Sequence, residues 1–373
     1  MTYIKQMKHK FITLITLIVI SVQVNATTAT KKVLMVVSGY GQQQGEERPG
    51  YEFDEFTKAY SVFKANSIAV DIASPNGGKV EAGKYDPKKS YNAKVLADEY
   101  IMAKLNNTIA TADIDAKSYD GIFVVGGKGA MFDLPKDKAL QTLIADIYQQ
   151  QGSVAAVCHG PAALVDVKLI DGSYLVANKK INSFTNVEEK LFGQKWLSSF
   201  EFMLEDKLTE RGAKFQSSEI MLSHVAVDER LITGQNPTST VDVALELVKS
   251  MGLKPVIEKR DIEDKTMAVV AKFLSGDNSA IELLQNESEQ YYLSLVGMYG
   301  FYYLKTAETD KHFENALALM KVAQEEINNP SLDMKIAKTQ HKLGQEASAK
   351  KTLNTLLLAK PDYKPALDML KTL

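Results

Sequence analysis

Cysteine is almost absent from this chain, since Cys158 is the only one in 373 residues. A single cysteine cannot form a disulfide within its own chain, so this thiol pairs with another chain, lies inert in the core or is reactive. An excess of charge of one sign is also missing, because 44 Lys and Arg residues stand against 46 Asp and Glu residues. This balance creates no overall positive field, and we therefore expect no nucleic-acid partner.

A hydrophobic run long enough for a membrane span is missing from the N-terminus. Three lysines precede the apolar stretch 11–22, and small residues that end at Ala26 follow it. The stretch is shorter than the roughly 20 residues that cross a bilayer, and this order is typical of a secretory signal peptide. We therefore expect cleavage of residues 1–26 near Ala26, no stable membrane anchor, and a protein that is periplasmic or secreted.

Histidine is scarce as well, with five residues in the chain. His9 lies in the expected signal peptide, and His312 and His341 lie near the C-terminus, which leaves His159 and His224 in between. These two residues and one cysteine show no metal-ligand spacing, and no phosphate-binding glycine motif occurs. We expect no metal and no cofactor, and we interpret His224 as a structural or pocket-edge residue.

From Thr30 onward the chain alternates short β-rich runs with helical patterns. The expected strands begin in the segments 31–39, 68–78, 120–129, 153–158 and 230–234, and the expected helices are 55–66, 137–152 and 240–252. This alternation predicts an α/β fold with a doubly wound parallel sheet and helices on both faces. In such sheets ligands bind at the C-terminal ends of the strands.

Cys158 follows one of these expected strand ends. Strand 153–157 stops there, Gly160 permits a tight turn, and Pro161 suits the first position of a helix over 161–168. A strand, a sharp turn and a helix form a nucleophile elbow, and a helix N-terminus favours a thiolate. We therefore interpret Cys158 as a nucleophile, with a thiol pKa below its ordinary value of about 8.5.

The motifs around this elbow resemble those of the DJ-1/PfpI superfamily. They are "VCHGPAAL", with "VVGGKGAMFD" upstream and "LITGQNP" downstream, and the resemblance extends over roughly residues 31–252. Within the superfamily they are similar to the Hsp31-like, glutathione-independent glyoxalase III branch. The resemblance implies a flavodoxin-like, class I glutamine amidotransferase-like fold for a catalytic domain over residues 27–253.

The resemblance also implies an acidic partner for the cysteine. By the distance to "VDIASP", this partner falls on Glu55, the second acid of "EFDEF". Glu52 and Asp54 lie close by, and spacing alone does not separate the three. A buried carboxylic acid next to a thiolate should have a raised pKa, as a proton shuttle requires.

The remaining site residues follow from the same resemblance. The family's histidine falls on His159 and the third member of its triad on Glu189, with Glu188 as an open alternative. The backbone N–H groups of Gly127 and His159 would stabilise an oxyanion. The family's "GGHG" reads "GGKG" here, which places Lys128 at the pocket rim in place of a histidine.

The activity that the resemblance implies is a glyoxalase III or D-lactate dehydratase-like lyase reaction. A small dicarbonyl such as methylglyoxal would be converted to a 2-hydroxy acid, D-lactate, by a cysteine nucleophile and a glutamate proton shuttle, without a cofactor. Two alternatives stay open. The first is a stress-related holding chaperone or redox sensor of the Hsp31/DJ-1 type, and the second is a cysteine amidase or peptidase with deglycase-like activity.

The C-terminal part of the sequence differs from the rest. The charged run 254–265 suggests a linker, and residues 266–373 lack strand signals and suggest helices. The segment 343–363 resembles the second helix of a tetratricopeptide repeat, and 312–330 is a weaker copy. These helices would bind a protein partner or pack on the catalytic domain, and a homodimer is an open alternative. We expect few contacts across the linker, so that a chain ending near Lys254 keeps its turnover.

Overall fold

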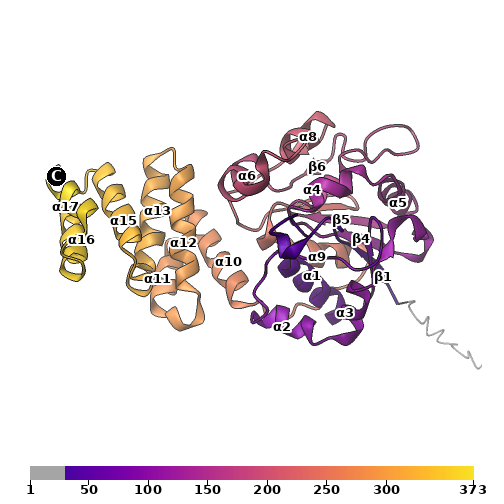
Figure 1. Ribbon diagram of the computed structural model, residues 1–373, viewed down its shortest axis with the longest axis horizontal. Coiled ribbons are helices and arrows are strands. Elements are labelled where there is room, and N and C mark those ends of the chain that lie inside the picture. The colour runs from indigo at the N-terminus through magenta and orange to yellow at the C-terminus, as the bar shows by residue number, and fades with distance from the viewer. Residues whose placement is uncertain (1–29) are drawn as a thin grey trace, which may run out of the picture. The chain divides into compact units, whose positions relative to one another are not determined.

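The computed structural model describes residues 30–373 and contains one seven-stranded sheet in the order β3-β2-β1-β4-β5-β9-β8 (Figure 1). Its strands are β1 (Lys32–Val36), β2 (Ala69–Ser74), β3 (Ile109–Ala110), β4 (Gly121–Val124), β5 (Ser153–Val157), β8 (Val225–Asp228) and β9 (Leu231–Gly234). All neighbours pair in parallel except β8, which is antiparallel to β9. The predicted doubly wound, flavodoxin-like fold is confirmed. The predicted signal peptide, residues 1–26, lies outside the described residues.

The two faces of the sheet are buried because successive side chains of a strand point to opposite sides. On β1, Val33 and Met35 join one core cluster, and Leu34 and Val36 join the other. Helices α1 (Phe53–Ala65) and α9 (Thr240–Ser250) cover the first face, and α5 (Lys138–Gln149) covers the second. A continuously apolar strand such as β1 is therefore stable because helices cover both faces of the sheet.

Shorter elements complete this α/β domain. They are α2 (Ser90–Leu96), α3 (Glu99–Leu105), α4 (Ala130–Asp133), α6 (Asn186–Phe192), α7 (Gln194–Leu197), α8 (Leu204–Glu210), and a two-stranded sheet of β6 (Lys180–Ile181) and β7 (Lys214–Phe215). Because β1, β4, β5 and β9 are parallel, the segments that follow them meet at one edge of the sheet. That edge is where the fold predicts a ligand site.

The chain from α10 onward is helical, as predicted. This helical segment consists of α10 (Ile262–Leu274), α11 (Ser279–Asn286), α12 (Leu293–Tyr303), α13 (Asp310–Val322), α14 (Gln324–Ile327), α15 (Pro330–Lys342), α16 (Glu346–Ala359) and α17 (Lys364–Leu370). Ala349, Leu353 and Leu356 are buried, as the repeat-like spacing requires, while membership of a repeat family stays a prediction. Among residues 30–373, no helix combines the length and the apolar character needed to cross a membrane.

The stretch expected to be a linker is held against the domain. Val256 N–H donates to Asn66 at 2.6 Å, and the next helix already begins at Ile262. Lys58 of α1 forms ion pairs with Asp261 at 3.1 Å and with Asp264 at 2.7 Å. The expectation of few contacts is therefore wrong, because buried charges of the domain have their partners in this stretch.

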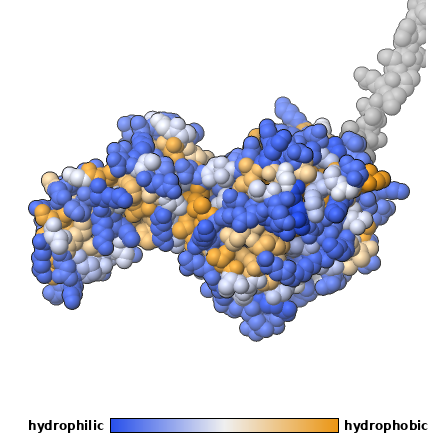
Figure 2. All heavy atoms as spheres, turned by 90° about the horizontal axis from the view of Figure 1, so that it is seen from above, coloured by the Kyte–Doolittle hydropathy of each residue, from blue (hydrophilic) through white to orange (hydrophobic). Residues whose placement is uncertain are grey.

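Apolar packing also joins the helical segment to the domain. Ile220 and Leu222 of the domain belong to the same buried cluster as Met267, Val270 and Tyr303 of the helical segment. Figure 2 shows hydrophobic residues, in orange, on the helical segment next to the domain. A chain ending near Lys254 would expose this cluster to water, so we now expect such a truncation to lose stability.

Candidate active site

Cys158 occupies a strained turn directly after β5. Its φ is +60°, a left-handed conformation that is uncommon for a residue with a side chain. Two backbone hydrogen bonds hold it there: its N–H donates to Gly234 at 2.9 Å, and its carbonyl accepts from Phe184 N–H at 2.9 Å. The predicted sharp turn is therefore present. Cys158 itself is 3% exposed.

The helix expected after the turn is much shorter than predicted. Residues Gly160–Leu164 form one short 3₁₀ helix in place of an α-helix over 161–168. So short a helix has a weak dipole, and the thiolate gains little from it. Burial raises the pKa of the Cys158 thiol well above its ordinary value, and the Glu55 carboxylate adds to this effect. The predicted lowering of the thiol pKa is therefore wrong.

Glu55 lies in the first turn of α1, fully buried next to Cys158. Its Oε2 accepts a hydrogen bond from Gly126 N–H at 2.7 Å, and its Oε1 has no partner among residues 30–373. A Cβ on Gly126 would lie 2.6 Å from that Oε2 and 2.8 Å from Cys158 Cβ, so only glycine fits between them. Burial raises the pKa of Glu55 well above its ordinary value, which favours the carboxylic acid.

The two neighbouring acids have other surroundings. Asp54 accepts hydrogen bonds from Lys89 at 2.8 Å, Tyr91 at 2.9 Å and Asn92 at 2.6 Å. Glu52 is half-buried, and its loss of water contact together with the charge of Asp54 raises its pKa to about 7. Of the three acids that spacing could not separate, Glu55 is therefore the one whose carboxyl group packs, with Cys158, against Gly126.

A histidine and a second glutamate complete the arrangement. Cys158 Sγ lies 3.3 Å from His159 Nδ1, and His159 Nε2 lies 2.7 Å from Glu189 Oε2. Both the histidine and Glu189 are buried. A carboxylate that orients an imidazole next to a thiol is the usual geometry of an activated nucleophile.

The Glu188 side chain forms hydrogen bonds with other parts of the domain. Its Oε1 accepts from Met221 N–H at 2.7 Å and from Asn236 at 2.9 Å, and its Oε2 closes a capping box with Thr185 at the start of α6. These hydrogen bonds stabilise the loops around the site. The structure therefore brings Glu189, and not Glu188, to the histidine.

Two backbone N–H groups near Cys158 are free to bind an oxyanion. Those of Gly127 and His159 have no acceptor in the part of the chain that the structure describes. Gly127 has a φ of +92°, and a Cβ there would lie 2.4 Å from Glu52 N, so this position requires glycine. Lys128 follows Gly127, and its charge counteracts the rise in the Cys158 pKa.

Aromatic side chains line the histidine, and the sequence analysis missed their role. The ring centroid of Phe184 lies 4.6 Å from that of His159, and Phe200 lies 6.2 Å away. Phe132 extends this wall through Phe200 and Trp196. The position of Phe184, directly before the segment with Glu189, is the signal that could have identified it.

Among residues 30–373, no group of three or more His, Cys, Asp or Glu side chains could hold a metal ion. His224 uses its backbone in hydrogen bonds with Ser239 and Gln235, and its Nδ1 is buried without a partner among these residues. The side chains that the structure gathers around Cys158 are an imidazole, from His159, and the carboxyl groups of Glu55 and Glu189.

Comparison with known proteins identifies the family of the α/β domain. A model described as the DJ-1/PfpI family matches residues 48–250. The chain is 30% identical over 238 residues to the glutathione-independent glyoxalase hsp3102 of Schizosaccharomyces pombe, which covers 59% of this chain and 98% of that protein. It is 28% identical over 246 residues to the glutathione-independent glyoxalase HSP31 of Saccharomyces cerevisiae, with 60% and 99% covered.

Two solved structures match over a similar share of this chain. The crystal structure of glyoxalase III from Candida albicans has 25% identity and a TM-score of 0.55, and covers 59% of this chain and 97% of that one. The structure of Rapid Encystment Protein 24 kDa from Francisella tularensis has 34% identity and a TM-score of 0.55, with 60% and 99% covered. These relatives therefore match about three fifths of the chain.

Proposed function

Because this chain belongs to the DJ-1/PfpI family, we propose that it is a glutathione-independent glyoxalase that converts 2-oxoaldehydes such as methylglyoxal to 2-hydroxy acids such as D-lactate. One observation carries the proposal. Cys158 and the carboxyl group of Glu55 are both buried and both pack against Gly126, where a Cβ would lie 2.6 Å from Glu55 Oε2 and 2.8 Å from Cys158 Cβ. A nucleophile beside a protonated acid provides both the covalent attachment and the proton transfer that this isomerisation requires.

The first step is addition of the thiol to the aldehyde carbon. His159 Nδ1, 3.3 Å from Sγ, accepts the thiol proton as the carbon–sulfur bond forms. Glu189, 2.7 Å from Nε2, stabilises the resulting imidazolium. The N–H groups of Gly127 and His159 bind the developing oxyanion, and Glu55 donates its proton to that oxygen to give a hemithioacetal.

The second step moves a proton between two carbons. Glu55, now a carboxylate, removes the hydrogen from C1 and returns it to C2 through an enediol, while the hydroxyl proton passes from the C1 oxygen to the C2 oxygen. The product is a thioester of the hydroxy acid, and His159 returns its proton to Glu55. Water then attacks the thioester, the carbon–sulfur bond breaks, and the 2-hydroxy acid leaves with the thiol restored.

The raised pKa of Glu55 is essential to this sequence. A carboxyl group with an ordinary pKa would be ionised at neutral pH and would have no proton for the hemithioacetal oxygen. Burial and the nearby Glu52 both raise it. We also propose that the enzyme is exported, since residues 1–26 have the pattern of a signal peptide.

The experiment is a measurement of D-lactate formed from methylglyoxal without glutathione, by the wild type and by Cys158→Ser. We expect turnover by the wild type and none by the variant, because a hydroxyl is a much weaker nucleophile than a thiol. Equal activity of both proteins would refute the proposal. Absence of activity in the wild type would favour the amidase or the chaperone alternative.

A further inference from the structure

A cavity of about 550 Å³ borders the catalytic acid, where the helical segment meets the domain. Glu55 lines this cavity and also packs with Cys158 against one glycine, so the cavity adjoins the site already described. Another part of its wall, Phe192, ends α6, the helix that carries Glu189. The ring centroid of Tyr302 in α12 lies 4.8 Å from that of Phe192. The helical segment therefore closes the cavity against an element of the catalytic site.

The volume of this cavity is much larger than a three-carbon substrate needs. Sites of roughly 300–1,000 Å³ hold ligands of drug size. The relatives described above match about three fifths of this chain over nearly their whole length, and the family model ends at residue 250. The part of the wall that comes from α10 and α12 is therefore an addition to the family's domain, and it makes room for a substrate larger than methylglyoxal.

Most of the residues that line the cavity are apolar, and the helical segment supplies several of them. Met267 belongs to α10, and Leu295 and Met298 belong to α12. The domain contributes Phe192 and Ile220. A hydrocarbon group that enters such a pocket removes apolar surface from water on both sides of the contact, which is favourable. These side chains therefore favour a hydrocarbon ligand.

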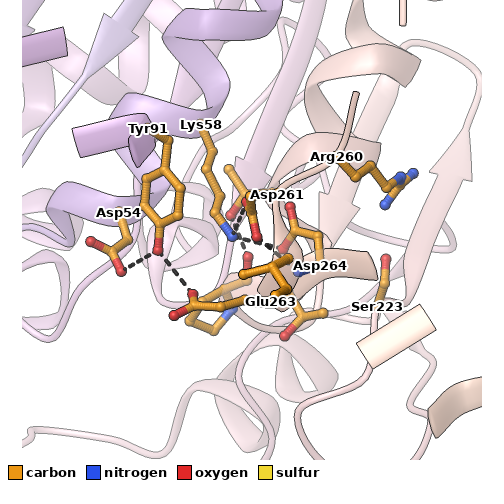
Figure 3. A network of polar contacts seen from close by, with 12 residues as sticks. Asp54, Lys58, Tyr91, Ser223, Arg260, Asp261, Glu263 and Asp264 are labelled. Atoms are coloured by element: carbon orange, nitrogen blue, oxygen red, sulfur yellow. Dashed lines mark hydrogen bonds and ion pairs between the residues drawn. The ribbon is translucent and has the colours of Figure 1, made fainter. Parts of the chain in front are cut away.

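The charged residues that line the cavity are paired with one another. Figure 3 shows Lys58 directed at Asp264, which it binds at 2.7 Å. Lys89 binds Asp54 at 2.8 Å and Glu263 at 3.1 Å. Because both lysines already have carboxylate partners, neither is free to bind an anionic substituent, and the carboxylates would repel one. The wall therefore favours a neutral, apolar substituent.

We propose that this cavity holds the hydrocarbon substituent on C2 of the substrate, and that the preferred substrates are 2-oxoaldehydes with an apolar chain longer than the methyl group of methylglyoxal. This inference rests on the proposed function. In that reaction Glu55 moves a proton between C1, which is bonded to Cys158, and C2. Glu55 therefore contacts the carbon that bears the substituent, and the substituent begins next to a residue that lines the cavity.

The experiment compares kcat/KM of the full chain for 2-oxooctanal and for methylglyoxal, measured as 2-hydroxy acid formed without glutathione. We expect a kcat/KM about a hundredfold higher for 2-oxooctanal, because its longer chain leaves water for the apolar wall. Turnover of methylglyoxal with an equal or lower kcat/KM for 2-oxooctanal would refute this inference alone. Turnover of neither aldehyde would refute the proposed function, and this inference with it.

A matched pair of variants tests whether the helical segment forms the wall. Leu295→Trp fills the cavity from α12, and should lower the ratio of kcat/KM for 2-oxooctanal to that for methylglyoxal about tenfold. Leu358→Trp is the control and should leave this ratio unchanged, because Leu358 lies in α16, is 86% exposed and does not line the cavity. An unchanged ratio in Leu295→Trp, or an equal fall in Leu358→Trp, would contradict the proposal. If Leu295→Trp fails to fold, Met298→Trp decides, since Met298 lines the same cavity and is 50% exposed.

Discussion

Two buried carboxyl groups, Glu55 beside Cys158 and Asp264 in the first turn of α10, each have one oxygen without a hydrogen-bond partner in the part of the chain that the structure describes, but differ in their charged neighbours. Glu55 Oε1 and Asp264 Oδ2 are both buried without a hydrogen-bond partner among residues 30–373. Glu55 lies beside a thiol and near another acid, and its pKa is raised well above the ordinary range. Asp264 lies beside Lys58, whose charge limits the rise to a pKa of about 6.

This comparison shows that the charge of the neighbouring side chain, more than burial, determines whether a buried carboxyl group is protonated at neutral pH. Without a cation nearby, Glu55 holds its proton at neutral pH and can act as an acid. With a cation nearby, Asp264 is ionised at neutral pH and can hold two parts of the chain together. The predictions below change one neighbour at a time.

The largest effect on stability is expected for Lys58, the cation that pairs with Asp264. Lys58→Met should lower the free energy of unfolding by about 3 kcal/mol or more, because it leaves Asp261 and Asp264 without their buried partner. Lys94→Met is the control, because the Lys94–Glu258 pair is more than half exposed and should contribute less than about 1 kcal/mol. Urea unfolding measures both. Equal stability of the two variants would show that the α10 contact does not stabilise the domain.

A smaller effect is expected for the acid behind the histidine. Glu189→Gln should reduce the turnover of methylglyoxal about a hundredfold with little change in stability, because an amide cannot stabilise an imidazolium. Glu188→Gln should reduce stability, since its carboxylate accepts from Met221, Asn236 and Thr185. Steady-state kinetics and thermal unfolding of each variant separate the two roles. The reverse pattern would assign the triad to Glu188.

The smallest effect concerns the thiol itself. Burial raises the pKa of Cys158, and Glu55 raises it further once it is ionised, so the rate of iodoacetamide labelling should rise with pH and show its inflection above about 8.5. Glu55→Gln removes one of the two causes, and the inflection should move to lower pH. An inflection below the ordinary thiol value in the wild type would show that Lys128 or His159 outweighs burial.

Local features of the sequence predicted the parts of the fold and site that depend on nearby residues. Cys158, His159 and Gly160 are consecutive, so the turn and the thiol–imidazole contact could be foreseen. The length of the following helix could not, because a run of Pro, Ala and Leu is compatible with either helix type. Glu55 and Glu189 could be predicted as site residues only from the family resemblance, since their distance from Cys158 in the chain says nothing of their distance in space.

The contact between the domain and the helical segment was beyond prediction for a similar reason. Lys58 and Asp264 are 206 positions apart, and a charged run such as 254–265 is typical of an exposed linker. Only the tertiary structure shows that its acids face a buried lysine.

The most direct test of the central claim compares Glu55→Gln with Glu52→Gln in D-lactate formation from methylglyoxal without glutathione, with labelling of Cys158 measured in parallel. We expect Glu55→Gln to lose turnover by at least about a thousandfold while Cys158 is still alkylated, because an amide cannot carry the proton. Glu52→Gln should keep most of its activity, since Glu55, and not Glu52, has its carboxyl group packed with Cys158 against Gly126. Retained turnover in Glu55→Gln, or a greater loss in Glu52→Gln, would contradict the account.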